Sequence, residues 1–129
     1  MAALTRNTPR TRIGLGQRFA DPVAAAVTIY SGAMVALDAS GNAIPAIPAA
    51  PTMRGVALEE ADNADGAAGD VTTLIERGAF LVANGGSIDR THIGGDVYVA
   101  DDNTVAATGT LVAGKCLDVT SAGVVVEIL

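Results

Sequence analysis

The chain has 129 residues, enough for one compact domain that buries about two thirds of the surface its unfolded form exposes. Half of the residues are apolar, mostly Ala and Val; without Trp and with only two Phe and two Tyr, a large aromatic-lined pocket is hard to build. One cysteine excludes an intramolecular disulfide, and the net charge of -6 is unevenly distributed: residues 1–18 carry four arginines and no acid.

The first twenty residues show neither helical nor strand periodicity, and Pro9, Gly14 and Gly16 interrupt them. We therefore expect residues 1–20 to form an extended basic arm in front of a single β-barrel-like domain of residues 21–129. The arm suits an acidic protein surface, with arginines for charged contacts and apolar side chains as anchors. The candidate contact residues are Arg6, Arg10, Arg12, Arg18, Ile13, Leu15 and Phe19.

Two other roles for the arm remain open, an unstructured tail and a nucleic-acid contact. Arginines without acids would neutralise phosphates. However, the rest of the chain holds 4 basic and 14 acidic side chains and would be repelled by a polyanion. The arginines of the arm also have no aromatic residue between them that could stack on bases. We therefore expect no nucleic-acid partner.

The apolar run from Val23 to Leu37 is the one segment that invites a signal-peptide interpretation. It is too short to cross a membrane, which takes about 20 residues, and no A-x-A cleavage site follows it. We expect a protein made in the cytoplasm with no membrane association.

From Pro22 onward, short runs rich in Val, Ile and Thr alternate with clusters of Gly, Ser, Asn and Asp. Examples are "VTIY", "MVALD", "RGVALEE", "DVTTLIE", "DVYVAD" and "VVVEIL". This pattern predicts an all-β fold, either a small β-barrel or a sandwich. Only "GSIDRTHIGG" is compatible with a helical turn, for which Ser87 is the expected N-cap.

The runs also repeat. Gly32 and Asp38 bracket "AMVAL" as Gly95 and Asp101 bracket "DVYVA", 63 residues later. Because Asp side chains bond nearby backbone amides, both aspartates are expected to form turns. The sequence predicts two pseudo-repeated hairpin units that close on each other.

The spacing between the copies shrinks along the chain. "GVALE" at Gly55 corresponds to "GKCLD" at Gly114, an offset of 59, and "DVTT" at Asp70 corresponds to "GVVV" at Gly123, an offset of 53. We expect the first copy to carry the longer loops.

The sequence motifs of common enzyme classes are incomplete or absent. Phe19 stands where a dinucleotide fingerprint needs its third glycine, and no phosphate loop, nucleophile elbow or zinc-protease motif is present. Cys116 is expected to be a small core residue and His92 a loop or surface residue. We expect no enzyme and no cofactor.

The acidic run "EEADNADGAAGD" is the nearest approach to a metal site. Ala64 stands where the calcium-loop spacing that starts at Asp62 needs an oxygen ligand. The run is therefore expected to be a solvated turn, and no metal site is predicted.

Five segments, taken in order, resemble the small capsid decoration, or cement, proteins of tailed bacteriophages: "TRNTPRTRIGLGQRF", "IYSGAMVALDASGNAIPA", "RGVALEEADNADGAAGDVTTLIERGAF", "IGGDVYVADDNTVAATG" and "VAGKCLDVTSAGVVVEIL". The resemblance implies a virion structural protein with a β-barrel-like body on the outer surface of an icosahedral head. It also implies a homotrimer that bridges neighbouring subunits of the major capsid protein.

The alternative is a small β-barrel module on the virion that binds a ligand or receptor, such as a saccharide. The two interpretations differ in the aromatic side chains. A binding module predicts an exposed cleft holding Tyr30, Phe80 or Tyr98 with polar neighbours, whereas the decoration role predicts that these side chains are buried.

Overall fold

The computed structural model describes Arg6 and residues 18–129. Within these residues nearly all regular structure is β-strand, which confirms the all-β prediction. The elements are β1 (Arg18–Pro22), β2 (Val27–Ile29), β3 (Met34–Leu37), β4 (Ala43–Pro45), β5 (Thr52–Ala57), β6 (Ala61–Asn63), β7 (Thr72–Glu76), β8 (Gly78–Asn84), the 3-10 turn η1 (Arg90–His92), β9 (Asp96–Val99), β10 (Thr104–Ala106), β11 (Val112–Thr120) and β12 (Gly123–Ile128).

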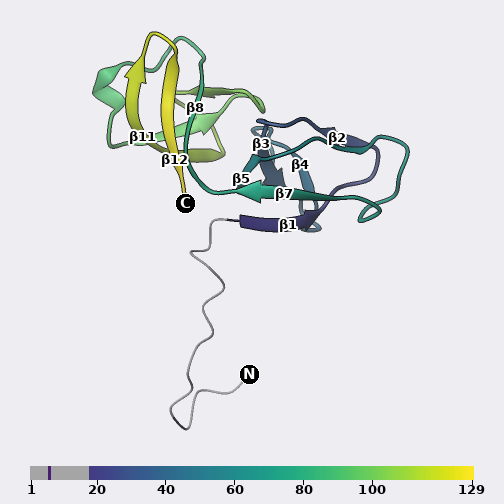
Figure 1. Ribbon diagram of the computed structural model, residues 1–129. Coiled ribbons are helices and arrows are strands. Elements are labelled where there is room, and N and C mark those ends of the chain that lie inside the picture. Colours follow the sequence, from purple (N-terminus) through teal and green to yellow (C-terminus); the bar gives the residue numbers. More distant parts are fainter. Residues whose placement is uncertain (1–5, 7–17) are drawn as a thin grey trace.

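The strands form two units that follow one another along the chain (Figure 1). The first is a five-stranded sheet with the order β1-β7-β5-β3-β4, beside a two-stranded sheet of β2 and β6. The second is a closed barrel with the order β10-β8-β12-β11-β9. Its strands alternate buried and more exposed residues, as in the pattern eBiB of β9, because one face of each strand points into the barrel.

The two units have the same topology, so the predicted duplication is confirmed. The order β1, β7, β5, β3, β4 of the first repeat matches β8, β12, β11, β9, β10 of the second. The contacts that bring the first and last strands of each repeat together match as well. Val23 forms a parallel bridge with Ala43, just as Asn84 pairs in parallel with Val105. Each repeat thus forms its own unit, and the two hairpin sets do not close on each other as expected.

Backbone pairing corrects two of the three predicted offsets. Val35 pairs with Gly55 as Val97 pairs with Gly114, giving offsets of 62 and 59. The value of 63 was wrong by one residue because Asp38 and Asp101 occupy successive positions of their turns, although each accepts a hydrogen bond from the amide two residues later. Aspartate forms this turn at either position, so the residue type does not fix the register.

The third offset is 51 rather than 53. Ile75 pairs with Ala57 as Val126 pairs with Cys116. The offset therefore falls from 59 to 51 between the two paired strands. The connection from β5 to β7 makes the first repeat eight residues longer than the connection from β11 to β12 makes the second. The extra residues fall in the connection that contains β6 and the acidic run, so the longer loops do lie in the first copy as predicted.

Pro22 explains why only the second repeat closes fully. Its equivalent is Ala83, whose amide donates a hydrogen bond to the carbonyl of Asn103 over 3.0 Å. Proline has no N–H to donate. The first repeat is therefore joined at this seam by the single bridge between Val23 and Ala43.

Buried side chains form two clusters rather than the single core expected from the chain length. The smaller lies within the first repeat and includes Ile29, Val35 and Ile75. The larger fills the barrel and also contains Met34 and Ala36 of β3. The first repeat thus contributes side chains to the core of the second, which joins the two.

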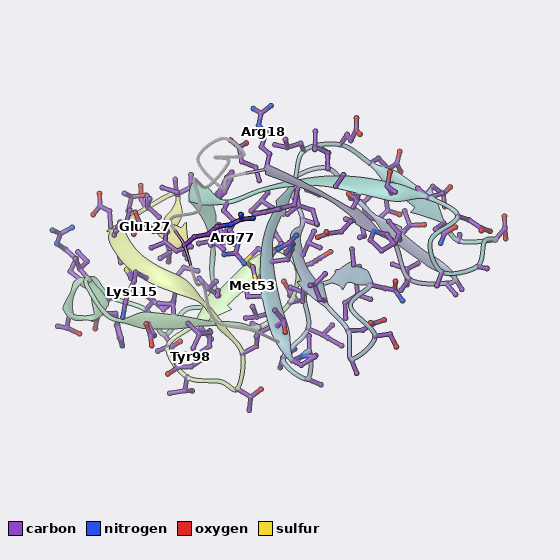
Figure 2. All side chains as sticks on the ribbon, turned by 90° about the horizontal axis from the view of Figure 1, so that it is seen from below. Arg18, Met53, Arg77, Tyr98, Lys115 and Glu127 are labelled. Atoms are coloured by element: carbon purple, nitrogen blue, oxygen red, sulfur yellow. The ribbon has the colours of Figure 1, made fainter. Side chains whose placement is uncertain are left out.

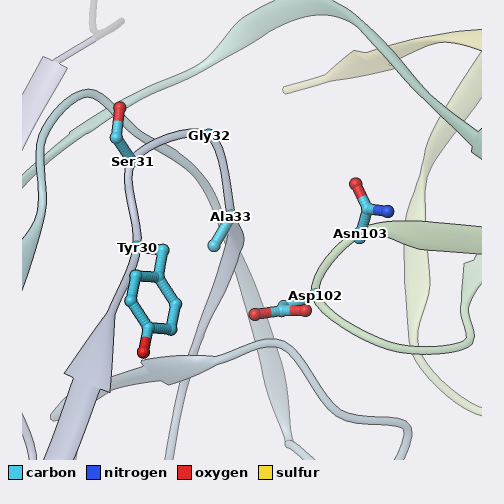
Figure 3. A pocket seen from close by; sticks show the side chains of 6 residues that line it. All are labelled: Tyr30, Ser31, Gly32, Ala33, Asp102 and Asn103. Carbon is cyan, nitrogen blue, oxygen red and sulfur yellow. The ribbon is translucent and has the colours of Figure 1, made fainter.

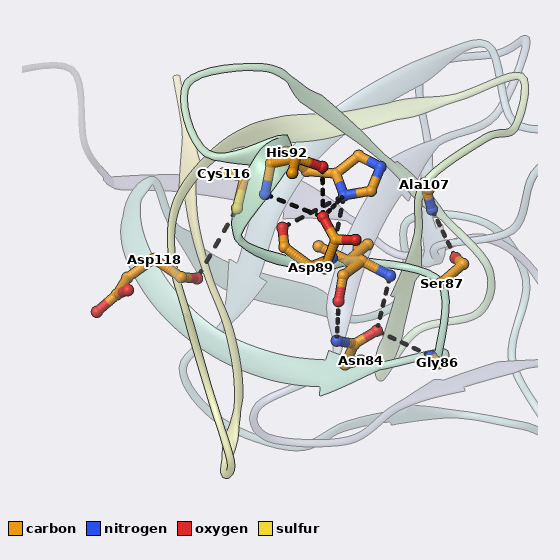
Figure 4. A network of polar contacts seen from close by, with 10 residues as sticks. Asn84, Gly86, Ser87, Asp89, His92, Ala107, Cys116 and Asp118 are labelled. Carbon is orange, nitrogen blue, oxygen red and sulfur yellow. Dashed lines mark hydrogen bonds and ion pairs between the residues drawn. The ribbon is translucent and has the colours of Figure 1, made fainter.

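The predicted helical turn is present, but its cap differs. Asp89 accepts a hydrogen bond from the Thr91 amide, and the His92 imidazole completes a capping box. The Ser87 hydroxyl instead accepts a hydrogen bond from the amide of Ala107, the residue after β10 (Figure 4).

Candidate binding sites at the arm root and between the repeats

The arm joins the body at β1. Of the predicted contact residues, Arg6, Arg18 and Phe19 are described, and Arg6 is exposed. The predicted contacts at Arg10, Arg12, Ile13 and Leu15 lie outside the described residues. Arg18 and Phe19 pair with Glu76 and Ile75 of β7, so both residues belong to the sheet of the body, although the predicted arm ran to residue 20.

Phe19 lies beneath two arginines. The Arg54 guanidinium carbon stands 3.9 Å from the centre of its ring, and that of Arg77 stands 5.7 Å from it. The Arg77 Nε also donates a hydrogen bond to the Arg54 carbonyl over 2.9 Å. Because cations are attracted to the face of an aromatic ring, Phe19 is held at the body surface.

Carboxylates complete this group. Arg54 donates to both oxygens of Asp21 over 2.6 and 3.0 Å, with only 21% and 13% of the two side chains exposed. Arg18 lies 3.8 Å from Glu76 and is largely exposed. We call the six residues Arg18, Phe19, Asp21, Arg54, Glu76 and Arg77 the arm root.

The arm root also links the two repeats. Arg77 is the residue between β7 and β8, and Figure 2 shows it at the junction between the repeats. Its hydrogen bond to the Arg54 carbonyl of β5 and its position over Phe19 therefore connect the base of the arm to the start of the barrel. The base of the arm therefore contains three arginines and two carboxylates, which are joined by hydrogen bonds and ion pairs.

A second candidate site lies between the repeats. An open groove of about 330 Å³ is lined by the turn from Tyr30 to Ala33 and by Asp102 and Asn103 of the barrel. Figure 3 shows the Tyr30 ring across from the Asp102 carboxylate, with Asn103 on the same loop as Asp102. Tyr30 is 63% exposed.

Backbone hydrogen bonds hold both walls of the groove. The Met34 amide donates to the Asp102 carbonyl over 2.7 Å, which fixes the barrel loop against β3. On the other wall, Ala33 N–H donates to the Tyr30 carbonyl, and Gly32 N–H donates to Ala57. Gly32 has a φ of +86°, which glycine adopts without strain.

The three aromatic side chains differ in exposure, so they do not all agree with either the binding-module or the decoration interpretation. Tyr30 is exposed beside polar neighbours, as a binding module requires. Phe80 and Tyr98 are half-buried, and Phe80 packs against the larger core cluster. The prediction of burial is therefore wrong for Tyr30.

Cys116 and His92 occupy the positions expected of them. Cys116 is buried in β11, with its Sγ 3.8 Å from the Asp118 carbonyl. Burial raises the pKa of the thiol; a backbone hydrogen bond at Asp118 partly offsets this, and the charge of Asp118 adds to the rise. His92 is a half-exposed member of η1, where its Nδ1 accepts a hydrogen bond from the Asp89 amide (Figure 4).

The acidic run folds as a turn held by its own side chains. Asp62 accepts hydrogen bonds from the Ala64 amide and the Thr28 hydroxyl, and both lower the pKa of its carboxyl group. Asp70 accepts one from the Ala67 amide. Among the described residues, no three His, Cys, Asp or Glu side chains are grouped to hold a metal ion.

Sequence reasoning missed part of each site. Arg54 and Arg77 are single arginines far from Phe19 in the sequence, and they come close to it because β7 pairs with both β1 and β5. Asp102 follows the predicted turn residue Asp101, and its approach to Tyr30 depends on how the repeats pack. The one available signal was the scarcity of basic residues outside the arm.

The comparisons with known proteins add no relative: no protein-family model, curated protein or solved structure matches the chain. In the part of the chain that the structure describes, no helix is long and apolar enough to cross a membrane.

Proposed function

We propose that the protein is a non-enzymatic decoration protein of a tailed-phage head, which binds the outer surface of the capsid and bridges subunits of the major capsid protein, as a homotrimer. The resemblance of five ordered segments suggests this role. The arm root is the observation that carries it. It holds three of the five basic side chains from Arg18 onward, on a body whose other charges are mostly acidic.

The arm root gives the arm a fixed origin. An arm that orders on an acidic surface loses conformational entropy, and a rigid base limits that loss. Several arms on one trimer would add binding sites by tethering. The capsid surface is therefore expected to be acidic where residues 1–17 bind.

Deleting residues 1–17 tests this role, because the cut leaves β1 complete from Arg18. The shortened chain should keep the circular dichroism spectrum and unfolding midpoint of the full chain, but co-sediment with expanded heads at least 10-fold more weakly. Arg90→Ala removes an exposed arginine far from the arm in sequence and should bind normally. Full binding by the shortened chain would refute the role of the arm, and sedimentation of the free protein would test the trimer.

Tyr30 favours a second candidate function, a ligand-binding module on the virion. Its exposed ring in a groove with polar neighbours is what that function requires. The two functions are compatible, since β1, which carries the arm, and β2, which leads into the groove, lie at opposite edges of the first repeat (Figure 1).

A further inference from the structure

The groove between the repeats has features of a preformed ligand site. Binding sites combine apolar surface with a few polar groups held in place before the ligand arrives. Here the apolar surface is the face of Tyr30, and the polar groups are the side chains of Asp102 and Asn103. The hydrogen bond from Met34 to Asp102 fixes the distance between the two walls.

Space above the turn is open as well. A Cβ built on Gly32 would meet no atom within 4 Å, so a ligand on the Tyr30 ring can extend over the turn. The Ser31 hydroxyl points away from the ring and donates a hydrogen bond to the Leu58 carbonyl. The polar contacts in the groove therefore fall to Asp102 and Asn103.

The polar groups select the class of ligand. The Asp102 carboxylate accepts hydrogen bonds, whereas the Asn103 amide both accepts and donates them. A ligand with hydroxyl groups satisfies both, but an arginine side chain has donors only and leaves the Asn103 donors unpaired. An anion is disfavoured by the charge of the body, where residues 19–129 hold 4 basic and 14 acidic side chains.

We propose that this groove binds a neutral saccharide, with the Tyr30 ring against one face of a sugar and Asp102 and Asn103 bonded to its hydroxyl groups. This gives the second candidate function a ligand class. Binding at one aromatic ring in an open groove is expected in the millimolar range. On a head carrying many copies, simultaneous contacts would strengthen attachment to a glycan surface, a consequence that rests on the proposed decoration role.

The chain offers a direct optical test. It has no Trp and two Tyr, so Tyr98→Phe leaves Tyr30 as its only tyrosine and its fluorescence reports on the groove. Glucose, galactose, N-acetylglucosamine and their short oligomers would be titrated to tens of millimolar. At least one should give a saturable change with the same affinity at low and high salt, because a neutral ligand is not screened.

Variants assign the response to the groove. Asp102→Asn and Asn103→Ala in the Tyr98→Phe chain should each weaken binding at least threefold. In Tyr30→Ala, amide NMR shifts of Gly32 and Asn103 should no longer follow the sugar. Tyr30 is exposed, so this variant should keep the unfolding midpoint of the unmodified chain.

Three results would overturn the proposal: no saturable response to any sugar, a response unchanged in Tyr30→Ala, or a salt-sensitive response to a peptide of residues 1–17 in place of the sugars. The last would make the groove a site for the arm. Head binding is measured separately, so failure here would leave the decoration role standing.

Discussion

Arg54 combines three contacts in one side chain. Its guanidinium group bonds both oxygens of Asp21 and lies over Phe19, while its carbonyl accepts a hydrogen bond from Arg77. A planar fork bonds a carboxylate at two points and stacks on a ring at once, which the ammonium group of lysine does not do.

We therefore expect a coupling of about 1.5–3 kcal/mol between Arg54 and Asp21, the range for hydrogen bonds to charged groups. Unfolding by urea of Arg54→Ala, Asp21→Ala and the double variant would measure it. Arg54→Lys should recover less than half of the loss. Additive single effects would show that the pair does not stabilise β1.

Asp89 gives the turn η1 a dependence on pH. Its carboxylate accepts hydrogen bonds from the Thr91 hydroxyl and amide, which lower the pKa of Asp89 below 3.8. A carboxyl pKa that is lower in the folded state adds stability above the unfolded pKa, and this stability is lost as pH falls through the folded value. Asp62 follows the same rule.

Carboxyl-carbon NMR should thus show Asp89 titrating below 3.8 in the folded protein, and Thr91→Ala should move the value upward. The stability of Asp89→Asn should fall less than that of the unmodified chain between pH 5 and pH 2. A folded Asp89 that titrates at or above its ordinary value would contradict the prediction.

At the scale of strands, the two repeats share a close approach that needs glycine. Gly55 and Gly114 sit beside equivalent bulges in β5 and β11. A Cβ on Gly55 would lie 2.6 Å from the Glu76 carbonyl oxygen, and one on Gly114 would lie 2.1 Å from that of Glu127. Both strands would have to move apart.

Gly55→Ala and Gly114→Ala should each lower the free energy of unfolding by about 1–3 kcal/mol, as overpacking does. Gly95→Ala is the matched control, because its nearest contact would be the His92 carbonyl at 3.3 Å. Urea unfolding of the three variants checks the order. Equal losses in all three would mean that the close approach is not responsible.

The strands and their duplication could be predicted from the sequence because apolar runs between turn residues recur in the same order. Offsets based on turn residues failed where Asp38 and Asp101 fill different positions of similar turns. Closure of each repeat on itself depends on long-range pairing such as that of Val23 with Ala43. The groove was not predictable for the same reason, since Tyr30 and Asp102 belong to different repeats.

For the whole molecule, Met34 is one of the side chains that join the two repeats. It is fully buried, it belongs to the core cluster of the barrel, and its amide bonds the Asp102 carbonyl. The barrel therefore completes its core with a side chain from outside its own repeat.

Met34→Ala should cost about 2–5 kcal/mol, the range for emptying a well-packed site. Met53→Ala, a half-buried methionine packed at the edge of the same cluster, should cost less. Denaturant unfolding of both variants gives the comparison. A larger loss for Met53→Ala would show that the repeats are not joined through Met34.

The eight extra residues between β5 and β7 have a practical consequence. In the second repeat, β11 and β12 are joined by a tight turn after Thr120, so these strands pair without a long connection. The first repeat keeps the same pairing around a longer connection that contains β6 and, directly after it, an exposed turn at Ala64 and Asp65. A foreign peptide inserted beside Asp65 would then be carried on a loop the fold already tolerates, making this position the natural one for displaying an epitope.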